Sequence, residues 1–280
     1  LVGRFLREAQ VMGRLQHRHV VDVFDVGRDG DVLYIVMELL QGTDLESLVR
    51  QKGPLPAGRV IHLLRQVCES LEEAHARGLV HRDIKPANIH VGRLGLRHDF
   101  VKVLDFGLVK SVDGEPRENS LATAWGHVAG TPGYMAPEVA MGESFDGRAD
   151  MYAVGCVAYY LLTGRMVFEA GNAMAVLARH MRDTPQAPSA VGEQAVPAEL
   201  DRLVLRCLAK AAAARPSADA RAPAVPGGGR RAHPAGPQGA AVLAGDAGTH
   251  ARGARKRGAL SHPRSILLRR LLADRRAASL

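Results

Sequence analysis

The hydrophobic residues in the first 40 positions follow two different spacings. In residues 4–15, RFLREAQVMGRL, apolar side chains recur at helical spacing with charged residues between them. Two apolar runs rich in β-branched residues follow at 20–26 and 32–40, and the turn-forming sequence GRDGD separates them. This pattern predicts one amphipathic helix followed by a β-hairpin.

From Gly42 onward the apolar spacing is mainly helical. A helix is predicted to begin near Ala57 and to end before Gly78, which suits a left-handed C-terminal cap. The segment that begins near Asp150 is apolar on nearly every side and predicts a buried helix, and an amphipathic helix is predicted within 198–210. The predicted fold class is therefore α+β, with a helix and hairpin strands followed by a mainly α-helical part.

The periodic pattern stops after RPSADA, and residues 221–280 are dominated by Ala, Gly, Pro and Arg. The net charge of +8 is concentrated there: 12 Lys and Arg against 2 Asp and Glu give +10, whereas residues 1–220 hold 25 against 27, a net of −2. This composition predicts a disordered tail. Its last stretch, 265–280, has the pattern of a short basic helix that could contact nucleic acid or an anionic membrane. A solvated tail without that role is favoured, because no aromatic residue is present for base stacking.

The location of the chain is predicted from what the sequence lacks. No apolar run reaches the roughly 18 to 20 residues that cross a bilayer, and the first residues have no signal-peptide pattern. The cysteines Cys68, Cys156 and Cys207 lie far apart in apolar helical patterns, with no CxxC spacing. We therefore expect buried free thiols in a reducing compartment, the cytoplasm.

Three polar motifs interrupt the second part of the chain in a fixed order. HRDIKPANI occupies 81–89, VLDFG occupies 103–107 and GTPGYMAPE occupies 130–138. Each motif alone is a weak signal. Together, in this order and spacing, they resemble the protein kinase family over roughly residues 4–220, and most closely the eukaryotic-like serine/threonine kinases of bacteria.

The resemblance implies a set of residues for phosphoryl transfer from ATP, a reaction catalysed mainly by positioning and by electrostatic stabilisation. Asp83 is expected to accept or orient the proton of the substrate hydroxyl. Lys85 is expected to hold the γ-phosphate, and its spacing from Asp83 resembles the serine/threonine branch. Asn88 and Asp105 are expected to supply oxygen ligands to Mg²⁺, which bridges the phosphates.

The resemblance also implies residues around the nucleotide. Glu8 matches the helix glutamate of the small lobe, Met37 matches the gatekeeper, and the backbone of Glu38 and Leu39 is expected to bind adenine. His90 departs from the family, because an apolar residue is expected beneath the adenine ring.

Further matches concern regulation. Arg82 resembles the arginine that pairs with a phosphorylated activation loop, and Ser120 and Thr123 are candidate phosphorylation sites. Thr131 is expected to orient Asp83 and to face the substrate. His81 is expected to pack beneath the phenylalanine of VLDFG, with a structural role.

Two matches concern support of the site. Glu138 and Arg215 match the buried ion pair of the family, which is costly to break. Asp150 is expected to hydrogen-bond to the backbone of the catalytic loop from the central helix.

His17 and His19, in LQHRHVV, have the spacing of a possible metal pair. The family has a histidine at the first of these positions, in a structural loop. The structural interpretation is favoured over a metal site.

The resemblance divides the chain into a remnant of the small lobe at 1–42, a large lobe at 43–220 and the tail at 221–280. Glu8 needs a lysine partner on an earlier strand, preceded by a glycine-rich loop over the phosphates, but only seven residues precede it. The sequence is therefore read as N-terminally truncated, as a fragment in preference to a natural truncation. For these 280 residues we expect very weak nucleotide binding.

Three functions remain open. The first is a serine/threonine kinase catalytic domain that uses ATP and Mg²⁺, acts on protein substrates and self-associates for autophosphorylation. The second is a non-catalytic scaffold or binding module with a kinase-like fold. The third is an anionic-surface binder that acts through the tail, whose binding would depend steeply on salt.

Overall fold

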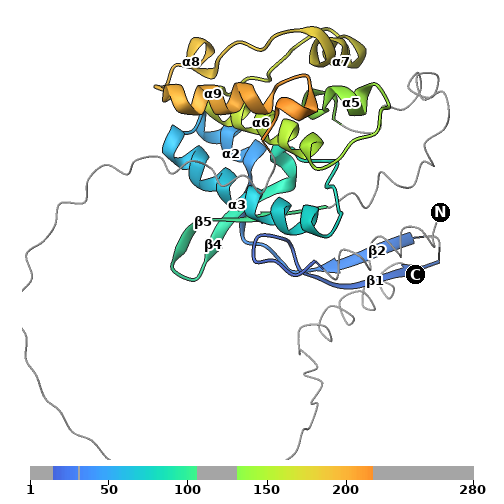
Figure 1. Cartoon of the computed structure of the whole chain (residues 1–280). Helices are drawn as coiled ribbons and strands as arrows, with labels where there is room; N and C mark the ends of the chain where they lie inside the picture. Colours follow the sequence, from blue (N-terminus) through green and yellow to red (C-terminus); the bar gives the residue numbers. More distant parts are fainter. Residues whose placement is uncertain (1–14, 31, 106–130, 217–280) are drawn as a thin grey trace, which may run out of the picture. The chain divides into compact units, whose positions relative to one another are not determined.

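The computed structural model describes residues 15–30, 32–105 and 131–216. The predicted helix at 4–15 and the tail at 221–280 thus lie outside the described residues, apart from Leu15. Figure 1 shows the arrangement of the strands and helices. Within the described ranges, none of the helices has the length and the apolarity needed to span a bilayer.

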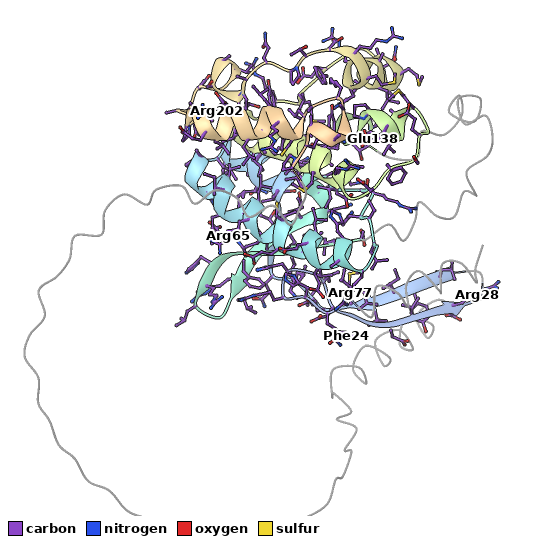
Figure 2. All side chains as sticks on the ribbon, viewed as in Figure 1. Phe24, Arg28, Arg65, Arg77, Glu138 and Arg202 are labelled. Atoms are coloured by element: carbon purple, nitrogen blue, oxygen red, sulfur yellow. The ribbon has the colours of Figure 1, made fainter. Side chains whose placement is uncertain are left out.

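The first two strands form an antiparallel hairpin, β1 (Val23–Asp29) and β2 (Val32–Met37). Phe24 of β1 is 68% exposed and projects from the ribbon (Figure 2). The prediction of a strand at 20–26 was wrong at its start, because Val20 and Val21 belong to the buried core and not to the hairpin. They are 2% and 3% exposed, and Val20 forms a parallel bridge with Val103.

A second sheet was not predicted, since the sequence after Gly42 was read as mainly helical. It contains β3 (Gly42–Asp44), β4 (Ile89–Leu94) and β5 (Arg97–Val103), in antiparallel order β3-β4-β5. Gly42 has a φ of 135°, and a Cβ atom there would collide with the carbonyl oxygen of Val91. This close approach requires glycine at the start of β3.

The helical core was predicted well. Helix α3 (Ala57–Ala76) begins where expected, and Gly78 follows its end with a φ of 72° and donates its N–H to the His75 carbonyl at 2.9 Å. Helix α6 (Arg148–Thr163) is buried along almost its whole length, and it contacts α3, α9 (Ala198–Cys207) and α8 (Pro188–Val191).

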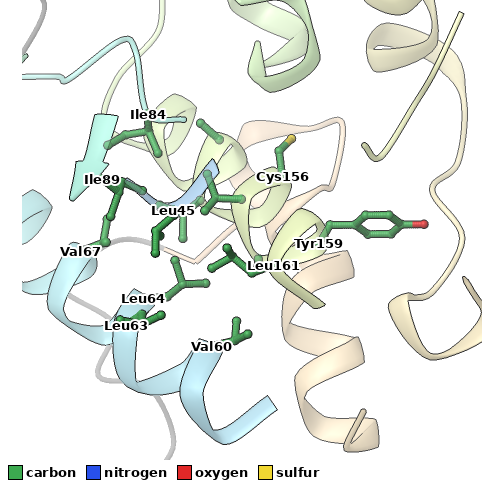
Figure 3. Packing of buried hydrophobic residues seen from close by; sticks show 14 of the residues in the cluster. Leu45, Val60, Leu63, Leu64, Val67, Ile84, Ile89, Cys156, Tyr159 and Leu161 are labelled. Atoms are coloured by element: carbon green, nitrogen blue, oxygen red, sulfur yellow. The ribbon is translucent and has the colours of Figure 1, made fainter. Parts of the chain in front are cut away.

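Figure 3 shows how these elements share one core, with side chains of α3 facing Leu161 of α6 and Leu45 of α2 (Leu45–Lys52). The fully buried members include Val60, Leu63, Val67 and Leu161. Burying each such side chain stabilises the fold by about 1.5 to 3 kcal/mol.

The remaining described elements are short. They are α5 (Pro137–Ala140), α7 (Ala173–Arg182) and the 3-10 turns η1 (Pro86–Asn88), η3 (Pro132–Tyr134) and η4 (Ala212–Ala214). The turn η3 contacts α6 and α7. Two of these turns matter for the site described next, because η1 contains Asn88 and Thr131 directly precedes η3.

Candidate active site

The antiparallel pairing of β4 and β5 brings two sequence motifs together. Asn88 immediately precedes β4, and Asp105 follows β5 by two residues. Ile89 pairs with Val103 in the register, and the Leu104 N–H donates to the Asn88 carbonyl at 2.9 Å. The start of one strand therefore lies beside the end of the other, and both predicted Mg²⁺ ligands lie at this edge.

Asp83, Lys85 and Asn88 form one connected polar cluster. The Lys85 ammonium lies 2.9 Å from Asp83 Oδ2. The side-chain amide of Asn88 donates to the same oxygen at 3.0 Å and to the Asp83 carbonyl at 2.9 Å. Lys85 also reaches Thr131 Oγ1 at 3.4 Å, which connects the cluster to the segment before η3. The Asp83 side chain is 19% exposed, so its carboxylate is oriented and still accessible.

Two backbone positions in the site have a positive φ without glycine. Arg82 has a φ of 68° and Asp105 a φ of 52°. This conformation is unfavourable for side-chain-bearing residues, and it persists where neighbouring contacts impose it. A hydrogen bond stabilises this backbone conformation of Arg82, because its N–H donates to Asp150 Oδ1 at 2.9 Å.

His81 joins the loop that carries Asp83 to the end of β5. Its side chain is completely buried, and Nε2 donates to the Leu104 carbonyl at 2.8 Å, while Nδ1 accepts the Asp83 N–H at 3.2 Å. Burial lowers the pKa of His81, against the opposing effect of nearby carboxylates, Asp150 first among them. The ring is therefore neutral, and its burial and pairing agree with the predicted structural role. The phenylalanine expected above it lies outside the described residues.

Asp150, in the first turn of α6, makes the predicted contact with the backbone of the loop that contains His81 and Arg82. Its carboxylate is 2% exposed and accepts the His81 N–H at 2.8 Å as well as the Arg82 N–H. The sequence analysis missed a third donor, His75 Nε2, at 2.8 Å. The signal that could have found it is its place on the last turn of α3, just before the loop. Three donors satisfy this buried charge and fix the loop.

The predicted pair between Glu138 and Arg215 is also present. The two side chains meet through two bonds, at 2.6 and 2.8 Å, and the Arg215 side chain has no exposed surface. Arg215 also donates to the carbonyls of Ala209, Arg148 and Lys210. The glutamate position is labelled in Figure 2.

The segment expected to contact adenine lies between the two sheets. Met37 ends β2 and is 37% exposed, and Leu39 is 94% exposed. Glu38 is held in place by the ammonium of Lys102, 2.5 Å from its Oε1, and by the Asp22 N–H at 2.9 Å. Lys102 was not singled out in the sequence, because its partner lies 64 residues away in the chain.

His90 lies in β4, between Asp44 of β3 and Lys102 of β5 in the register. It is half-buried, and this burial lowers its pKa, against the opposing effect of Asp44. Three other predicted site residues, Glu8, Ser120 and Thr123, lie outside the described residues.

The structure gives no support to a metal pair at His17 and His19. His19 Nδ1 donates to the Val101 carbonyl at 2.9 Å, and Nε2 lies 3.5 Å from Glu69, so both nitrogens have protein partners. In the part of the chain that is described, no group of three or more His, Cys, Asp or Glu side chains could hold a metal ion. The three cysteines are free, and Cys156 and Cys207 are buried.

The donor set at Asn88 and Asp105 does fit one metal, Mg²⁺. This ion is usually bound by one or two protein oxygens together with phosphate oxygens and water, and not by a full protein cage. Two protein ligands at one strand edge fit this mode of binding, and the Asp105 side chain is exposed at that edge.

Comparison with known proteins shows which family the chain is similar to. Residues 3–222 match the family model described as the protein kinase domain. The chain is 45% identical over 210 residues to serine/threonine-protein kinase Pkn1 of Myxococcus xanthus, covering 75% of the chain and 29% of that protein. It is 38% identical over 211 residues to PknB of Mycobacterium tuberculosis, covering 74% of the chain and 32% of that protein.

A solved structure shows the same fold. The crystal structure of Rad53 1-466 in complex with AMP-PNP superimposes with a TM-score of 0.64 at 26% identity, over 77% of this chain and 52% of that one. The chain spans only about a third of the length of the two bacterial relatives. Together with the kinase-like arrangement of a small sheet and a helical lobe, the match shows that this chain belongs to the protein kinase family.

Proposed function

We propose that the chain is the catalytic domain of a serine/threonine protein kinase. It transfers the γ-phosphoryl group of ATP, with Mg²⁺, to a serine or threonine hydroxyl of a protein. The observation that carries this proposal is the cluster in which Lys85 and Asn88 both contact the Asp83 carboxylate, beside the strand edge that ends at Asp105.

In the proposed reaction the substrate hydroxyl oxygen forms a bond to the γ-phosphorus while the bond to the ADP oxygen breaks. The hydroxyl proton passes to a carboxylate oxygen of Asp83, and ADP leaves with the electron pair of the broken bond. Asn88 holds Asp83 through two hydrogen bonds, so the carboxylate is oriented before the substrate arrives. Such preorganisation is the main source of catalysis in phosphoryl transfer.

Lys85 and Thr131 are proposed to align the two substrates. The Lys85 side chain is 25% exposed, and a lysine has four rotatable side-chain bonds, so its ammonium can leave the Asp83 carboxylate to contact the transferred phosphoryl group. Thr131 then keeps the acceptor segment near Asp83. Mg²⁺, when held by Asn88 and Asp105, would neutralise charge on the phosphate oxygens.

Regulation is proposed to involve phosphorylation of Ser120 or Thr123 by a second copy of the chain. Arg82 would pair with the phosphate, since arginine binds phosphate through two parallel hydrogen bonds. We further propose a cytoplasmic site of action.

The experiment is phosphate transfer from labelled ATP to a generic acceptor protein, using the protein translated from the full reading frame. Asp83→Asn and Asp105→Ala are each expected to abolish nearly all turnover. Glu199→Gln is the matched control, because this side chain is 75% exposed on α9 and its loss of charge should leave turnover unchanged. Full turnover in Asp83→Asn would reject the proposal.

A non-catalytic scaffold is the second candidate. It predicts that the purified protein binds a partner while transferring no phosphate at millimolar ATP, and that Asp83→Asn binds that partner equally well.

A further inference from the structure

His180 of α7 is a buried histidine that phosphoryl transfer does not use. Its side chain has no exposed surface, Nδ1 lies 2.8 Å from the Tyr152 hydroxyl, and the ring packs edge-on against Phe168 with 5.0 Å between centroids. Among the described residues, its Nε2 is the buried side-chain atom that has no hydrogen-bond partner. An unpaired buried polar atom costs free energy, so it needs an explanation.

The surroundings keep the ring neutral. Burial first, and then the Lys210 ammonium, lower the pKa of His180 to about 4. Lys210 donates to the His180 carbonyl at 2.7 Å, and the Arg215 guanidinium lies 4.9 Å from the centre of the Tyr152 ring. A neutral imidazole has one N–H, and when the Tyr152 hydroxyl donates to Nδ1 that proton is on Nε2.

The turn η3, which contains Gly133, packs against α7. The Gly133 backbone raises the pKa of the ring, against burial and the Lys210 ammonium, while Nε2 itself has no partner with hydrogen-bond geometry. Met166 covers the same glycine, since a Cβ atom at Gly133 would collide with the end of its side chain. The Tyr134 hydroxyl also contacts Met166 Sδ, at 3.3 Å.

The turn η3 lies next in sequence to Thr131, the residue that is proposed to face the protein substrate beside the cluster of Asp83, Lys85 and Asn88. Thr131 directly precedes η3 and contacts Lys85, which contacts Asp83. The Tyr134 N–H donates back to the Thr131 carbonyl at 3.1 Å, so the conformation of the turn and the position of Thr131 are coupled.

We propose that His180 is a positioning residue for the protein acceptor. Its Nε2–H completes a hydrogen bond to the Gly133 carbonyl when an acceptor peptide settles against the turn, and this bond fixes the turn beside Thr131. Nδ1, bonded to Tyr152, sets the tautomer that makes Nε2 the donor. The inference rests on the proposed function for its kinetic part, but the change in the turn itself can be measured without any phosphate transfer.

The test compares His180→Gln with His180→Met in the protein translated from the full reading frame. The two replacements have similar length, but only glutamine offers an N–H near the position of Nε2. With an acceptor peptide, His180→Met is expected to raise the peptide KM about fivefold, the worth of one net hydrogen bond. His180→Gln should stay within about twofold of the parent, and the KM for ATP and kcat should not change in either variant.

Amide hydrogen exchange at Tyr134 and Met135, with acceptor peptide present, gives a readout that needs no catalysis. His180→Met should speed exchange at both amides about fivefold and His180→Gln should not. Thermal unfolding of both variants identifies any general loss of folding. Equal effects of methionine and glutamine, or unchanged exchange in His180→Met, would overturn the inference. Absence of phosphate transfer from the parent protein would instead reject the proposed function.

Discussion

Two charged side chains, Asp150 and Glu38, are held in place in different ways. Asp150 is 2% exposed, and three N–H donors lie 2.8 to 2.9 Å from its carboxylate. The Glu38 side chain is 24% exposed and is held by one ammonium, that of Lys102, and one backbone N–H. The deeply buried carboxylate fixes the loop that carries Asp83, the residue proposed to take the proton, where small displacements would be costly for catalysis. The more exposed one fixes the segment that is proposed to contact adenine.

The largest expected effect is at another buried carboxylate of the helical lobe, Glu138, which forms an ion pair with Arg215. Arg215→Met should lower the free energy of unfolding by about 3 to 5 kcal/mol, because it leaves the Glu138 charge buried without its partner. Urea unfolding measures this. Arg202→Met is the matched control, since its pair with Glu199 is exposed and should contribute less than about 1 kcal/mol. A similar loss in both variants would contradict the distinction between buried and exposed pairs.

Asp150→Asn should give the next largest effect. The amide keeps one acceptor but turns an NH₂ group toward N–H donors, so the free energy of unfolding should fall by about 2 kcal/mol. Turnover should fall while the KM for ATP changes little, because the loop that carries Asp83 is loosened. Asp183→Asn, in an exposed pair with Arg179 at 3.8 Å, is the control expected to show neither change.

The free energy of unfolding, measured as a function of pH, tests the buried histidine His180 of α7. The pKa of His180 is about 4 in the folded protein and about 6.5 when unfolded, so the unfolded state binds more protons between these values. The contribution of this group to the free energy of unfolding is fully present above pH 6.5. It falls with the pH, by about 2 kcal/mol between pH 7 and pH 5. Urea unfolding at both pH values should show a smaller loss in His180→Gln. An equal loss in the parent protein and in His180→Gln would contradict a lowered pKa of His180 in the folded state.

The smallest effect is expected at Glu38, the more exposed of the two carboxylates compared above. Lys102→Met should lower the free energy of unfolding by about 1 kcal/mol, the usual worth of a partly exposed pair. It should raise the KM for ATP severalfold, because the Glu38 segment loses its anchor. A double variant with Glu38→Gln should cost no more than Lys102→Met alone. Additive losses would mean that the two side chains act independently.

The sequence predicted the helical core because its apolar spacing is long and regular. Helices α3, α6 and α9 each bury one face or all faces over ten residues or more, so their periods are unmistakable. The β3-β4-β5 sheet was missed because its strands have three to seven residues, with glycine at Gly42, Gly92 and the Gly95 turn. Val20 and Val21 look like strand residues, but tertiary packing places them in the core.

The site was predictable where adjacent residues carry it and was not where distant residues meet. Asp83, Lys85 and Asn88 lie within six positions, and their motif is distinctive. His75, Lys102 and His180 contact groups 28 to 75 residues away, and a histidine or a lysine in a helix or strand gives no local signal of such a partner.

The central claim is that Asp83, Lys85, Asn88 and Asp105 share one magnesium–nucleotide site. The most direct measurement is paramagnetic line broadening by Mn²⁺ in the presence and absence of ATP. Together, Mn²⁺ and ATP should broaden the side-chain amide resonances of Asn88 and the backbone amide of Asp105, and Asp105→Ala should remove most of this effect. Broadening confined to other parts of the chain, or identical broadening without ATP, would contradict the account.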